Sequence, residues 1–530
     1  MARRVDKITT HLTAATNSGD VTENAQNKAV SNPYLAGNFR PTSTEGHYGA
    51  LRVAKGEAPP AWLQGQFLRV GPNPKFDFTG KPYHSFDGDG FVHAVGFRDG
   101  VASYTKRFVR THRLVTSEQR GFDVSEIGMM STGDFSYPPH VTDKIKPNLA
   151  PAVARMGKAN TNLVAHAGRV LALEEADVPY EIVVSHDGDS NLRTVGRFDW
   201  QGRLEHAMTA HPKVDPVTGE LVFFAYELME AKCHYAVVDK NGALVRDFEV
   251  PLPCGVMMHD FVIAGEYSIL FDQRLEFRLE RVGEGKNPWV HRMDLPARFG
   301  VLPRLATSAD AIKWIDVAPC SLFHFANAWV EKDGTIVVVG SRLHYADFMP
   351  DMEVVNKPLG AKDTRGRLYE WRLDPRGTGR CVSERQLFDV ANDFPQVDAT
   401  RTGLKTRFVY ATRFVTDRAR LPRVEYAGNF AIDAIVKYDL ATGACTELPL
   451  TTSSGAQAYG GEAVFAPNPA RKAGEEDNGV LVVYAHDETT ERTQCLLIDA
   501  RDMRVLTWID VPERVPYGFH SLWVDEAYVR

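Results

Sequence analysis

Short runs of Val, Ile, Leu, Phe and Tyr alternate with tight-turn signals over almost the whole chain. Clear examples lie at 97–101, 165–171, 215–221, 239–244, 331–336 and 439–443. Asp-Gly and Asn-Gly pairs supply the positive φ angles that short hairpins need. Because this texture does not change along the chain, we predict one large all-β architecture. A β-propeller, a ring of antiparallel sheets, suits 530 residues and leaves no long free edge. No tidy short repeat fixes the number of blades.

Two segments depart from this texture. Residues 1–45 are polar at first and read as an N-terminal arm, partly extended, that precedes a single propeller domain over 46–530. Near 122–158 the turn signals vanish, and the stretch after Pro151 has an amphipathic look. We predict a helical insertion that caps the active-site face of the ring. Its apolar residues would form an entrance for an apolar substrate or a contact with a membrane surface. The alternative is a short surface helix without a functional role.

Composition limits the classes of partner. The net charge is −7 and no basic block stands out, so we expect no nucleic-acid partner. The six cysteines are scattered, which argues against a zinc ribbon or a disulfide framework and suits a reducing compartment. We find neither a secretory signal after Met1 nor a stretch of about 18 apolar residues that could span a membrane. We therefore expect a cytoplasmic protein, with peripheral membrane contact left open.

Four histidines lie far apart in unusually apolar frames. The frames are Thr-Ala-His-Pro at His211, Met-Met-His-Asp-Phe at His259, Phe-His-Phe-Ala-Asn-Ala at His324 and Gly-Phe-His-Ser-Leu-Trp at His520. Histidines in such surroundings are expected to be buried and neutral, and neutral imidazole is the commonest metal ligand. Two interpretations stay open at this point: four separate core histidines, each bonded to a carbonyl, or one all-nitrogen metal centre. The frames are absent at His84, His93, His206 and His344, which we leave out.

Several further motifs accompany the histidine frames. They are Asn-Pro-Tyr-Leu-x-Gly-Asn-Phe at 32–39, Gly-Gln-Phe-Leu-Arg-Val-Gly-Pro-Asn-Pro at 65–74, Phe-Asp-Gly-Asp-Gly at 86–90, Arg-Phe-Val-Arg-Thr at 107–111 and Ala-Asn-Thr-Asn at 159–162. In this order, from about Asn32 to Trp523, the chain resembles the carotenoid cleavage oxygenase family. That family includes apocarotenoid-forming enzymes, lignostilbene-cleaving dioxygenases and a retinoid isomerohydrolase. The combination of motifs is far more specific than any one of them.

The resemblance implies a fold and a metal. The fold is a seven-bladed β-propeller with Fe(II) on its axis, held by His211, His259, His324 and His520. Carboxylates at Glu175, Asp393 and Glu462 would hold three of these histidines through their second ring nitrogens. Asp393 stands where Glu is commonest, and because Asp is one methylene shorter, both a direct and a water-bridged contact are open. Zinc is the competing metal, although four ligands around zinc usually form a closed structural site.

The resemblance also implies a reaction: O₂-dependent cleavage of a conjugated C=C bond to two carbonyl products. We nominate no side chain as a general acid or base. Lignostilbene-cleaving relatives hold the phenolic oxygen with a Tyr and a Lys, where this chain has Phe108 and Glu174. These two residues and Phe323 are our candidates for the substrate tunnel. A carboxylate is a poor host for a phenolate, so we predict a carotenoid or apocarotenoid, with an aryl alkene such as a stilbene as the alternative.

Other functional classes remain as competitors. A propeller can serve as a binding scaffold with a structural metal or none. A carboxylate-metal propeller hydrolase such as a lactonase would need Asp, Glu or Asn ligands in place of four histidines. An isomerase within the same family would be distinguished from a cleaving enzyme by the mass of its product.

Overall fold

Tight hairpins dominate the computed structural model, which describes residues 32–78, 83–121, 123, 157–284, 286–346, 352–357, 365–423 and 431–530. Asp99 (φ 50°) and Gly100 (φ 77°) form the turn between two antiparallel strands, and Ala167 (φ 47°) with Gly168 (φ 74°) forms another. These are the left-handed angles that two-residue hairpin turns require. The prediction of an all-β fold is confirmed.

The described strands form seven sheets of four to six strands and one sheet of three. Sheet I contains β6 (Asn162–His166), β7 (Arg169–Leu173), β8 (Tyr180–Ile182) and β9 (Thr194–Arg197). Sheet II contains β10 (Lys213–Val214), β11 (Leu221–Tyr226), β12 (Lys232–Val238) and β13 (Leu244–Pro251). Sheet III contains β14 (Val262–Ala264), β15 (Tyr267–Asp272), β18 (Ala297–Pro303) and β19 (Lys313–Val317). Sheet IV contains β20 (Ser321–Val330), β21 (Ile336–Leu343), β23 (Arg367–Asp374) and β24 (Arg380–Gln386).

The remaining sheets follow the same antiparallel pattern, apart from one parallel pair in the small sheet. Sheet V contains β25 (Asn392–Gln396), β26 (Phe408–Phe414), β27 (Ile432–Asp439) and β28 (Ala444–Pro449). Sheet VI contains β29 (Tyr459–Gly460), β30 (Val464–Pro467), β31 (Gly479–Asp487), β32 (Arg492–Asp499), β33 (Arg504–Asp510) and β2 (Val53–Gly56). Sheet VII contains β34 (Ser521–Asp525), β3 (Gly65–Pro72), β4 (Gly90–Arg98), β5 (Val101–Phe108) and β1 (Gly46–Tyr48). The small sheet contains β16 (Leu275–Phe277), β17 (Trp289–Arg292) and β22 (Glu353–Val355).

The core lies between the sheets, because successive residues of a strand point to opposite faces. In β3, Phe67 belongs to a hydrophobic cluster shared with sheet VI, whereas Leu68 belongs to one shared with sheet I. Further clusters join sheets I and II, II and III, III and IV, IV and V, and V and VI. The packing therefore passes from sheet to sheet through all seven and returns to the first. Each of these sheets buries both of its faces.

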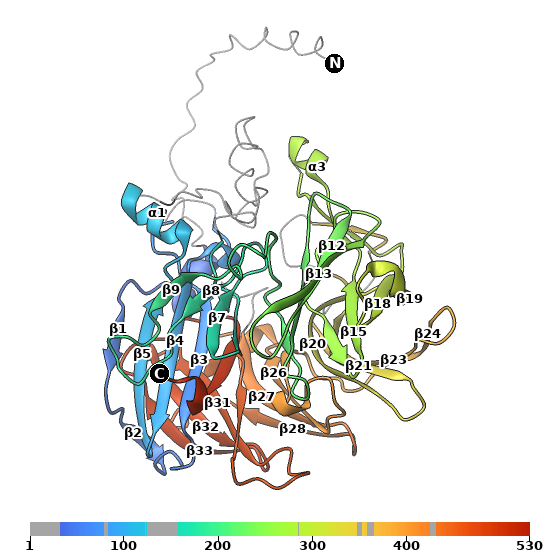
Figure 1. Ribbon diagram of the computed structural model, residues 1–530. Coiled ribbons are helices and arrows are strands. Elements are labelled where there is room, and N and C mark those ends of the chain that lie inside the picture. The colour runs from blue at the N-terminus through green and yellow to red at the C-terminus, as the bar shows by residue number, and fades with distance from the viewer. Residues whose placement is uncertain are drawn as a thin grey trace, which may run out of the picture.

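The two ends of the described chain meet in the sheets. The C-terminal strand β34 pairs with β3, and the early strand β2 pairs with β33. Figure 1 shows the resulting arrangement, with blue strands β3 to β5 beside red strands β31 to β33. Because these pairs join segments more than 400 residues apart in sequence, they tie the first and last parts of the fold together.

Helices are few among the described residues. The α-helices are α1 (His112–Arg120) and α3 (Leu279–Gly283), and the 3₁₀ turns are Pro33–Leu35, Gly37–Phe39, Ser85–Asp87, Ala309–Ala311, Ala399–Arg401, Arg418–Arg420 and Glu526–Tyr528. Helix α1 begins where the Thr111 hydroxyl accepts a hydrogen bond from Leu114 N and ends at left-handed Gly121. Both helices lie on one side of the molecule (Figure 1). The helical insertion predicted near 122–158 falls, except for residues 123, 157 and 158, outside the described residues. No described helix has the length and apolar character needed to cross a membrane.

Part of the segment predicted as an N-terminal arm is packed against the sheets. The Asn38 side chain is fully buried and donates a hydrogen bond to the Val515 carbonyl. Thr42 and Asn73 exchange two hydrogen bonds, from the Thr42 N–H to Asn73 Oδ1 and from Asn73 Nδ2 to the Thr42 carbonyl. Residues 32–45 are thus held in place by contacts to sheets VI and VII and the loops beside them.

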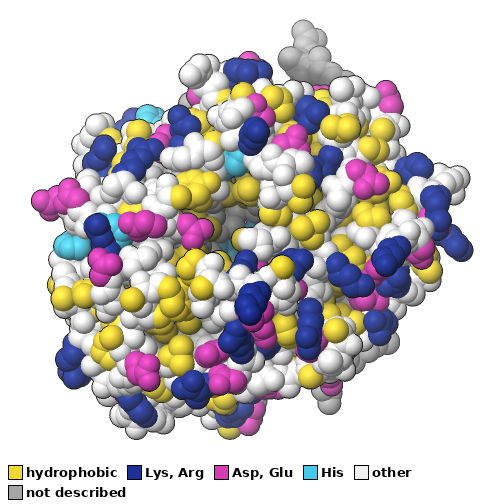
Figure 2. Space-filling view, turned by 60° about the horizontal axis from the view of Figure 1, so that its bottom comes forward, with side chains coloured by type: hydrophobic (Ala, Val, Ile, Leu, Met, Phe, Trp, Pro, Cys, Tyr) yellow, Lys and Arg dark blue, Asp and Glu magenta, His cyan; other side chains and the backbone are white. Residues whose placement is uncertain are grey.

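The outer surface mixes charges of both signs. On the face seen in Figure 2, Lys and Arg side chains alternate with Asp and Glu, and hydrophobic side chains lie between them. Some ion pairs among the described residues are exposed on both sides, such as Arg40 with Glu491 and Lys286 with Glu284. Exposed pairs of this kind contribute little to stability.

Candidate metal centre

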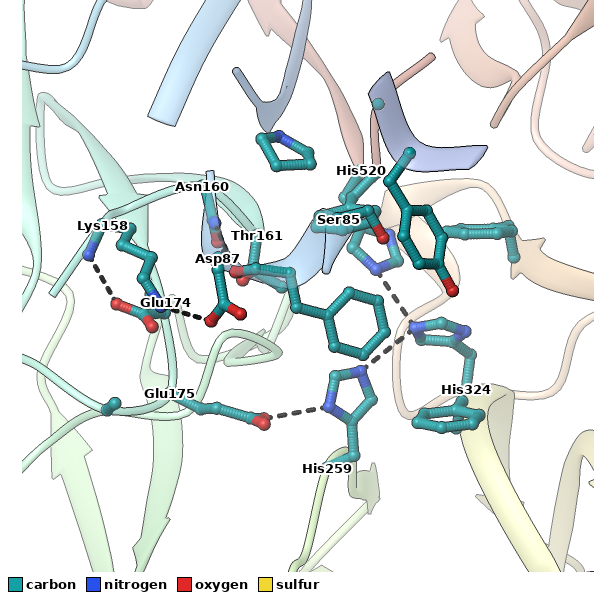
Figure 3. Close-up of a pocket in the computed structure, with 18 of the residues that line it drawn as sticks. Ser85, Asp87, Lys158, Asn160, Thr161, Glu174, Glu175, His259, His324 and His520 are labelled. Carbon is teal, nitrogen blue, oxygen red and sulfur yellow. Dashed lines mark hydrogen bonds and ion pairs between the residues drawn. The ribbon is translucent and has the colours of Figure 1, made fainter. Parts of the chain in front are cut away.

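The four histidines singled out in the sequence meet at one point. The Nε2 atom of His259 lies 3.0 Å from that of His211 and 3.3 Å from that of His324, and the Nε2 atoms of His324 and His520 are 3.1 Å apart. All four ligand atoms lie within 4.8 Å of one another. Figure 3 shows His259, His324 and His520 pointing toward one another. The interpretation as four separate core histidines is therefore wrong, because their ring nitrogens face one another.

Each histidine lies in an edge strand of a different sheet or in the residues just before that strand. His211 precedes β10, His259 precedes β14, His324 lies in β20 and His520 directly precedes β34. In β20 the strand register shifts between Leu322 and Phe325, so His324 sits on a bulge. Bulges re-aim side chains beside functional sites. Sheets II, III, IV and VII each contribute one imidazole in this way.

The other three sheets each contribute a carboxylate. His259 Nδ1 lies 2.9 Å from Glu175 Oε2 in the loop after β7, and His324 Nδ1 lies 2.9 Å from Asp393 Oδ1 in β25. His520 Nδ1 lies 3.1 Å from Glu462 Oε1, just before β30. A carboxylate accepts, so in each pair the Nδ1–H donates and the lone pair is left on Nε2. The three predicted carboxylates therefore fix the tautomer and direction of three imidazoles.

The carboxylates are themselves held by hydrogen bonds. The Tyr226 hydroxyl donates to Glu175 Oε1 at 2.8 Å. Gln396 Nε2 donates to Glu462 Oε1 at 2.6 Å, and the Ser521 N–H donates to Glu462 Oε2. Sequence reasoning did not find Tyr226 or Gln396, because neither lies near a histidine in the chain.

Asp393 contacts His324 directly, which settles the choice between a direct and a water-bridged contact. The register of β25 shifts between Asp393 and Gln396, and Phe394 has a left-handed φ of 52°. This bulge sets the path of the strand at Asp393 and offsets the missing methylene. The Phe394 ring stacks on His324 with ring centroids 5.0 Å apart, which covers one side of the imidazole.

Burial and neighbouring charges shift the pKa values of the histidines in this cluster. Burial, together with the neighbouring histidines, holds the pKa values of His211 and His324 well below the usual value. Burial also acts to lower the pKa of His259, but Glu175 outweighs it and the pKa is raised. Burial raises the pKa of Asp393 to about 7. Neutral imidazoles with their lone pairs pointing inward are the form that binds metals.

The donor set fits a divalent transition-metal ion. Where carboxylates fix the Nδ1–H tautomer, the facing Nε2 atoms are all acceptors, so their approach to about 3 Å needs a cation between them. Two nitrogens about 2.1 Å from one ion lie about 3.0 Å apart at a right angle and about 3.4 Å apart in a tetrahedron. The observed separations of 3.0, 3.1 and 3.3 Å span that range and begin at the right-angle value.

Asp260 links three of the histidine-bearing segments, and sequence reasoning did not find it. Its side chain is 3% exposed. Oδ2 accepts a hydrogen bond from the Phe325 N–H at 2.8 Å, next to His324, and Oδ1 accepts one from Lys213 Nζ at 2.7 Å, two residues after His211. Asp260 itself follows His259. One carboxylate thus sets the spacing of three ligands.

A cavity of about 210 Å³ opens onto three of the four histidines, His259, His324 and His520. Most of its walls are aromatic or aliphatic. The apolar lining residues include Tyr34, Phe39, Phe86, Met257, Trp289, Phe323, Phe394, Ile432, Tyr517 and Phe519. Tyr34 and Phe39 belong to the segment predicted as an arm, and the aromatic residues in its first motif were the only sequence signal for them. The cavity is shaped to hold an apolar ligand beside the metal centre.

The three predicted tunnel residues have different positions. Phe323 and Glu174 line the cavity. Phe108 is not among the lining residues; its ring packs on Phe91 and Leu114, beneath the Lys75 ammonium. Its place at the end of β5 points it into this separate cluster.

One wall of the cavity is polar (Figure 3). Glu174 Oε2 accepts a hydrogen bond from the Lys158 N–H at 2.6 Å, and Lys158 Nζ lies 3.1 Å from Asp87 Oδ1. All three residues line the cavity. Glu174 stands where lignostilbene-cleaving relatives have a Lys, but the wall still carries a positive charge, because Lys158 lies on it. The position of Lys158 directly before the Ala-Asn-Thr-Asn motif was the available sequence signal.

Comparisons with known proteins agree with this geometry. Residues 39–525 match the model of the family described as retinal pigment epithelial membrane protein. The chain is 37% identical over 514 residues to a carotenoid 9,10(9′,10′)-cleavage dioxygenase of Crocus sativus, with 94% of this chain and 90% of the relative covered. It is 31% identical over 548 residues to a carotenoid cleavage oxygenase of Mycobacterium tuberculosis, covering 94% and 99%.

Solved structures share the fold of this chain. The crystal structure of Pseudomonas brassicacearum lignostilbene dioxygenase superposes with a TM-score of 0.79 at 24% identity, covering 93% of this chain and 99% of that one. That of cobalt-substituted Synechocystis apocarotenoid oxygenase gives a TM-score of 0.74 at 26% identity, covering 92% and 97%. The second structure contains a metal in a protein of the same fold.

Proposed function

The chain belongs to the retinal pigment epithelial membrane protein and carotenoid cleavage oxygenase family, and on that premise we propose that it is a non-haem Fe(II) dioxygenase acting on a carotenoid or apocarotenoid. The protein is an oxygenase that cleaves a carotenoid or an aryl alkene. The proposal adds the metal, the residues that hold it and the substrate class. Its products are two carbonyl compounds, one from each carbon of the cleaved bond.

We propose that the seven large sheets form a closed seven-bladed propeller. The supporting observation is that hydrophobic clusters join each sheet to the next and join sheet VI to sheet VII and sheet VII to sheet I. One edge strand of every sheet would then face the axis. Four sheets bring histidines to that axis and three bring carboxylates, which is why residues 309 positions apart in sequence, such as His211 and His520, can share a ligand.

We propose that His211, His259, His324 and His520 hold Fe(II). Four neutral ligands would leave up to two positions of a six-coordinate ion for O₂ or solvent. Ferrous iron supplies the activation of O₂ for attack on the conjugated substrate. The absence of a charged ligand keeps the centre at a charge of +2, which favours the ferrous over the ferric state.

The protein's own residues orient the reactants. Glu175, Asp393 and Glu462 hold three imidazoles by their Nδ1–H groups, and Asp260 holds the spacing of their segments. Phe394 and Phe323 lie against the imidazoles, so the substrate side of the centre is apolar. This wall would exclude water from the reacting carbons and hold an extended alkene beside the four histidines. No side chain is required to move a proton.

We propose an elongated apolar substrate with a polar end. The apolar lining favours a polyene, and the polar wall of Asp87, Lys158 and Glu174 suits a hydroxyl or carbonyl terminus. Two curated relatives named for 9,10 cleavage make that bond the first to test. The aryl-alkene alternative is favoured by one observation: Lys158 places an ammonium on this wall, where a phenolic oxygen could be bound.

The convergence of four imidazoles on one point is the observation that carries the proposal. The test is anaerobic reconstitution with Fe(II), followed by addition of O₂ and a panel of apocarotenals, carotenoids and stilbenes. Mass spectrometry should find two carbonyl products per alkene, and His324→Ala should form none. His344→Ala removes an exposed histidine outside the site and should behave as wild type. Binding of a polyene without any product would favour a scaffold, and a product of unchanged mass would favour an isomerase.

We also propose a cytoplasmic location with peripheral contact to a membrane. The scattered cysteines, free among the described residues, support a reducing compartment. An apolar substrate dissolved in a bilayer would be reached by contact between the protein and the membrane surface. Fractionation of cells should place the protein in the soluble fraction, with part of it released from membranes by mild washing.

A further inference from the structure

A second cluster of metal-binding groups lies away from the four-histidine centre. It consists of His206, in the loop between sheets I and II, His234 in β12 and Asp247 in β13. The strand register places Ala236 opposite Asp247, so His234 and Asp247 are diagonal neighbours on one face of sheet II. All three ligand atoms lie within 4.8 Å of one another.

Both ring nitrogens of His206 face hydrogen-bond acceptors. Its Nδ1 lies 2.6 Å from the Ala207 carbonyl oxygen, which only accepts, so Nδ1 carries the hydrogen. In the neutral ring Nε2 is then an acceptor, yet it lies 3.0 Å from Asp247 Oδ1, a second acceptor. Two acceptors at this distance repel unless a cation lies between them. Donation of one ring N–H to a carbonyl while the other nitrogen faces a cation is the usual arrangement of a metal-bound histidine.

His234 lies beside this pair and offers one ring nitrogen as a third donor atom. Its ring stacks on His206 with centroids 4.0 Å apart and an interplanar angle of 22°. Its Nδ1 lies 3.9 Å from the same Asp247 oxygen. Burial and the neighbouring His206 lower the pKa of His234 to about 4, so this ring is neutral and has a lone pair at neutral pH. The 3.0 Å separation of His206 Nε2 from the carboxylate equals the distance of about 3.0 Å expected for two ligands at right angles around one ion.

The cluster is open to ions in solution. The His206 side chain is 7% exposed and that of His234 14%, while that of Asp247 is 27% exposed, so the carboxylate forms the entrance. Lys232 also acts to lower the pKa of His234, but its ammonium is paired with Glu230 and Glu249. Two imidazoles and one carboxylate select borderline transition-metal ions over Mg²⁺ and Ca²⁺, which prefer oxygen ligands.

We propose that His206, His234 and Asp247 form a second metal site, which binds a divalent transition-metal ion such as Zn²⁺ independently of the iron centre. Solvent completes the coordination of the ion. The site joins the loop before sheet II to two strands of that sheet, so the bound ion stabilises the fold there and takes no part in alkene cleavage. The competing occupant of the space between His206 and Asp247 is a proton, which would make His206 an imidazolium.

The test uses the full chain loaded with Fe(II) under anaerobic conditions. Zn²⁺ is titrated calorimetrically at a pH above the usual histidine value, where a proton competes least. The bound metals are then counted after gel filtration. Wild type should bind one zinc per chain and keep its iron. His206→Ala and His234→Ala should weaken zinc binding by at least the roughly 10–100-fold typical of losing an orienting partner. Asp247→Asn, which keeps the size of the side chain, should weaken it as well.

Two measurements distinguish zinc at this cluster from zinc at the iron centre or at surface histidines. His344→Ala removes an exposed histidine elsewhere and should bind zinc as wild type does. Iron content and alkene cleavage should be unchanged in the His206 and His234 variants, which shows that they are folded. Zinc uptake matched by an equal loss of iron, or zinc affinity unchanged in both variants, would overturn the proposal. If the wild type binds no zinc, a proton lies between His206 and Asp247, and the proposal of a second metal site is overturned as well.

Discussion

Replacement of Asp260 by Asn should separate positioning of the iron ligands from stability. Asn keeps the shape and one acceptor oxygen, but its NH₂ group cannot accept the second hydrogen bond. Either the Phe325 N–H or Lys213 Nζ then loses its partner. A hydrogen bond to a charged group contributes about 1.5–3 kcal/mol to the free energy of unfolding. With an unfolding entropy of about 2.1 cal/mol/K per residue, a chain of 530 residues loses about 1 °C of Tm per kcal/mol.

The expected result is therefore a large loss of activity with a small loss of stability. Asp260→Asn should lower Tm by only about 1–3 °C, whereas kcat/KM should fall about 10–100-fold because three ligand segments lose their common spacing. Asp439→Asn is the matched control. Asp439 is also buried, and it is paired with Arg407 at the end of an outer hairpin. That variant should show a comparable change in Tm with kcat/KM unchanged.

The assay combines thermal unfolding, iron content and steady-state kinetics on the iron-loaded enzyme. A fall in Tm of more than about 10 °C would correspond to about 10 kcal/mol for this chain length and would make Asp260 a general structural residue. Wild-type kcat/KM in the Asp260→Asn variant would refute the positioning role itself.

Three further predictions concern the same centre. Glu175→Gln and Glu462→Gln should each lower iron affinity or activity by about 10–100-fold without emptying the site, as metal analysis beside kinetics will show; wild-type values in both would remove their orienting role. Fe(II) at about 100 times its Kd should stabilise the wild type by about 2.7 kcal/mol in thermal unfolding and should not stabilise His324→Ala; equal shifts in both would place the iron elsewhere. Glu174→Gln should raise kcat/KM for 4-hydroxystilbene relative to an apocarotenal, because it removes a carboxylate that disfavours a phenolate; an unchanged ratio would show that Glu174 does not contact the substrate.

The all-β class could be predicted from local turn signals, whereas the meeting of four histidines was implied only by the resemblance of their frames to a known family. Turn residues such as Asp99-Gly100 and Ala167-Gly168 adopt the positive φ angles of hairpins. The all-β fold could therefore be predicted from these pairs and the short apolar runs between them. The histidine frames are apolar because each lies in or beside an edge strand whose surroundings are buried. The sequence could not show which sheets adjoin, since packing between sheets joins residues such as Phe67 and Tyr484 that are far apart in the chain.

The residues that sequence reasoning missed act through tertiary contacts. Tyr226 and Gln396 each hold a carboxylate from a different segment, and no spacing rule connects them to it. Asp260 lies beside His259, but its contacts to Phe325 and Lys213 are made far away in the chain. Lys158 changes the charge beside Glu174 although it lies 16 positions earlier. Phe108 lies in a motif but faces a separate cluster, since a strand residue's face depends on register. The second histidine cluster has no shared frame, because it is assembled by diagonal pairing across two strands.

Activity measured against iron content tests the central claim most directly. The metal-free protein is titrated anaerobically with Fe(II), and after addition of O₂ the initial rate of apocarotenal cleavage is recorded at each ratio of iron to chain. We predict a linear rise that ends at one iron per chain bound by His211, His259, His324 and His520, with no activity when Zn²⁺ replaces Fe(II). Full cleavage by the iron-free protein, or a rate that does not follow iron content, would contradict the assignment of these four histidines as the catalytic iron site.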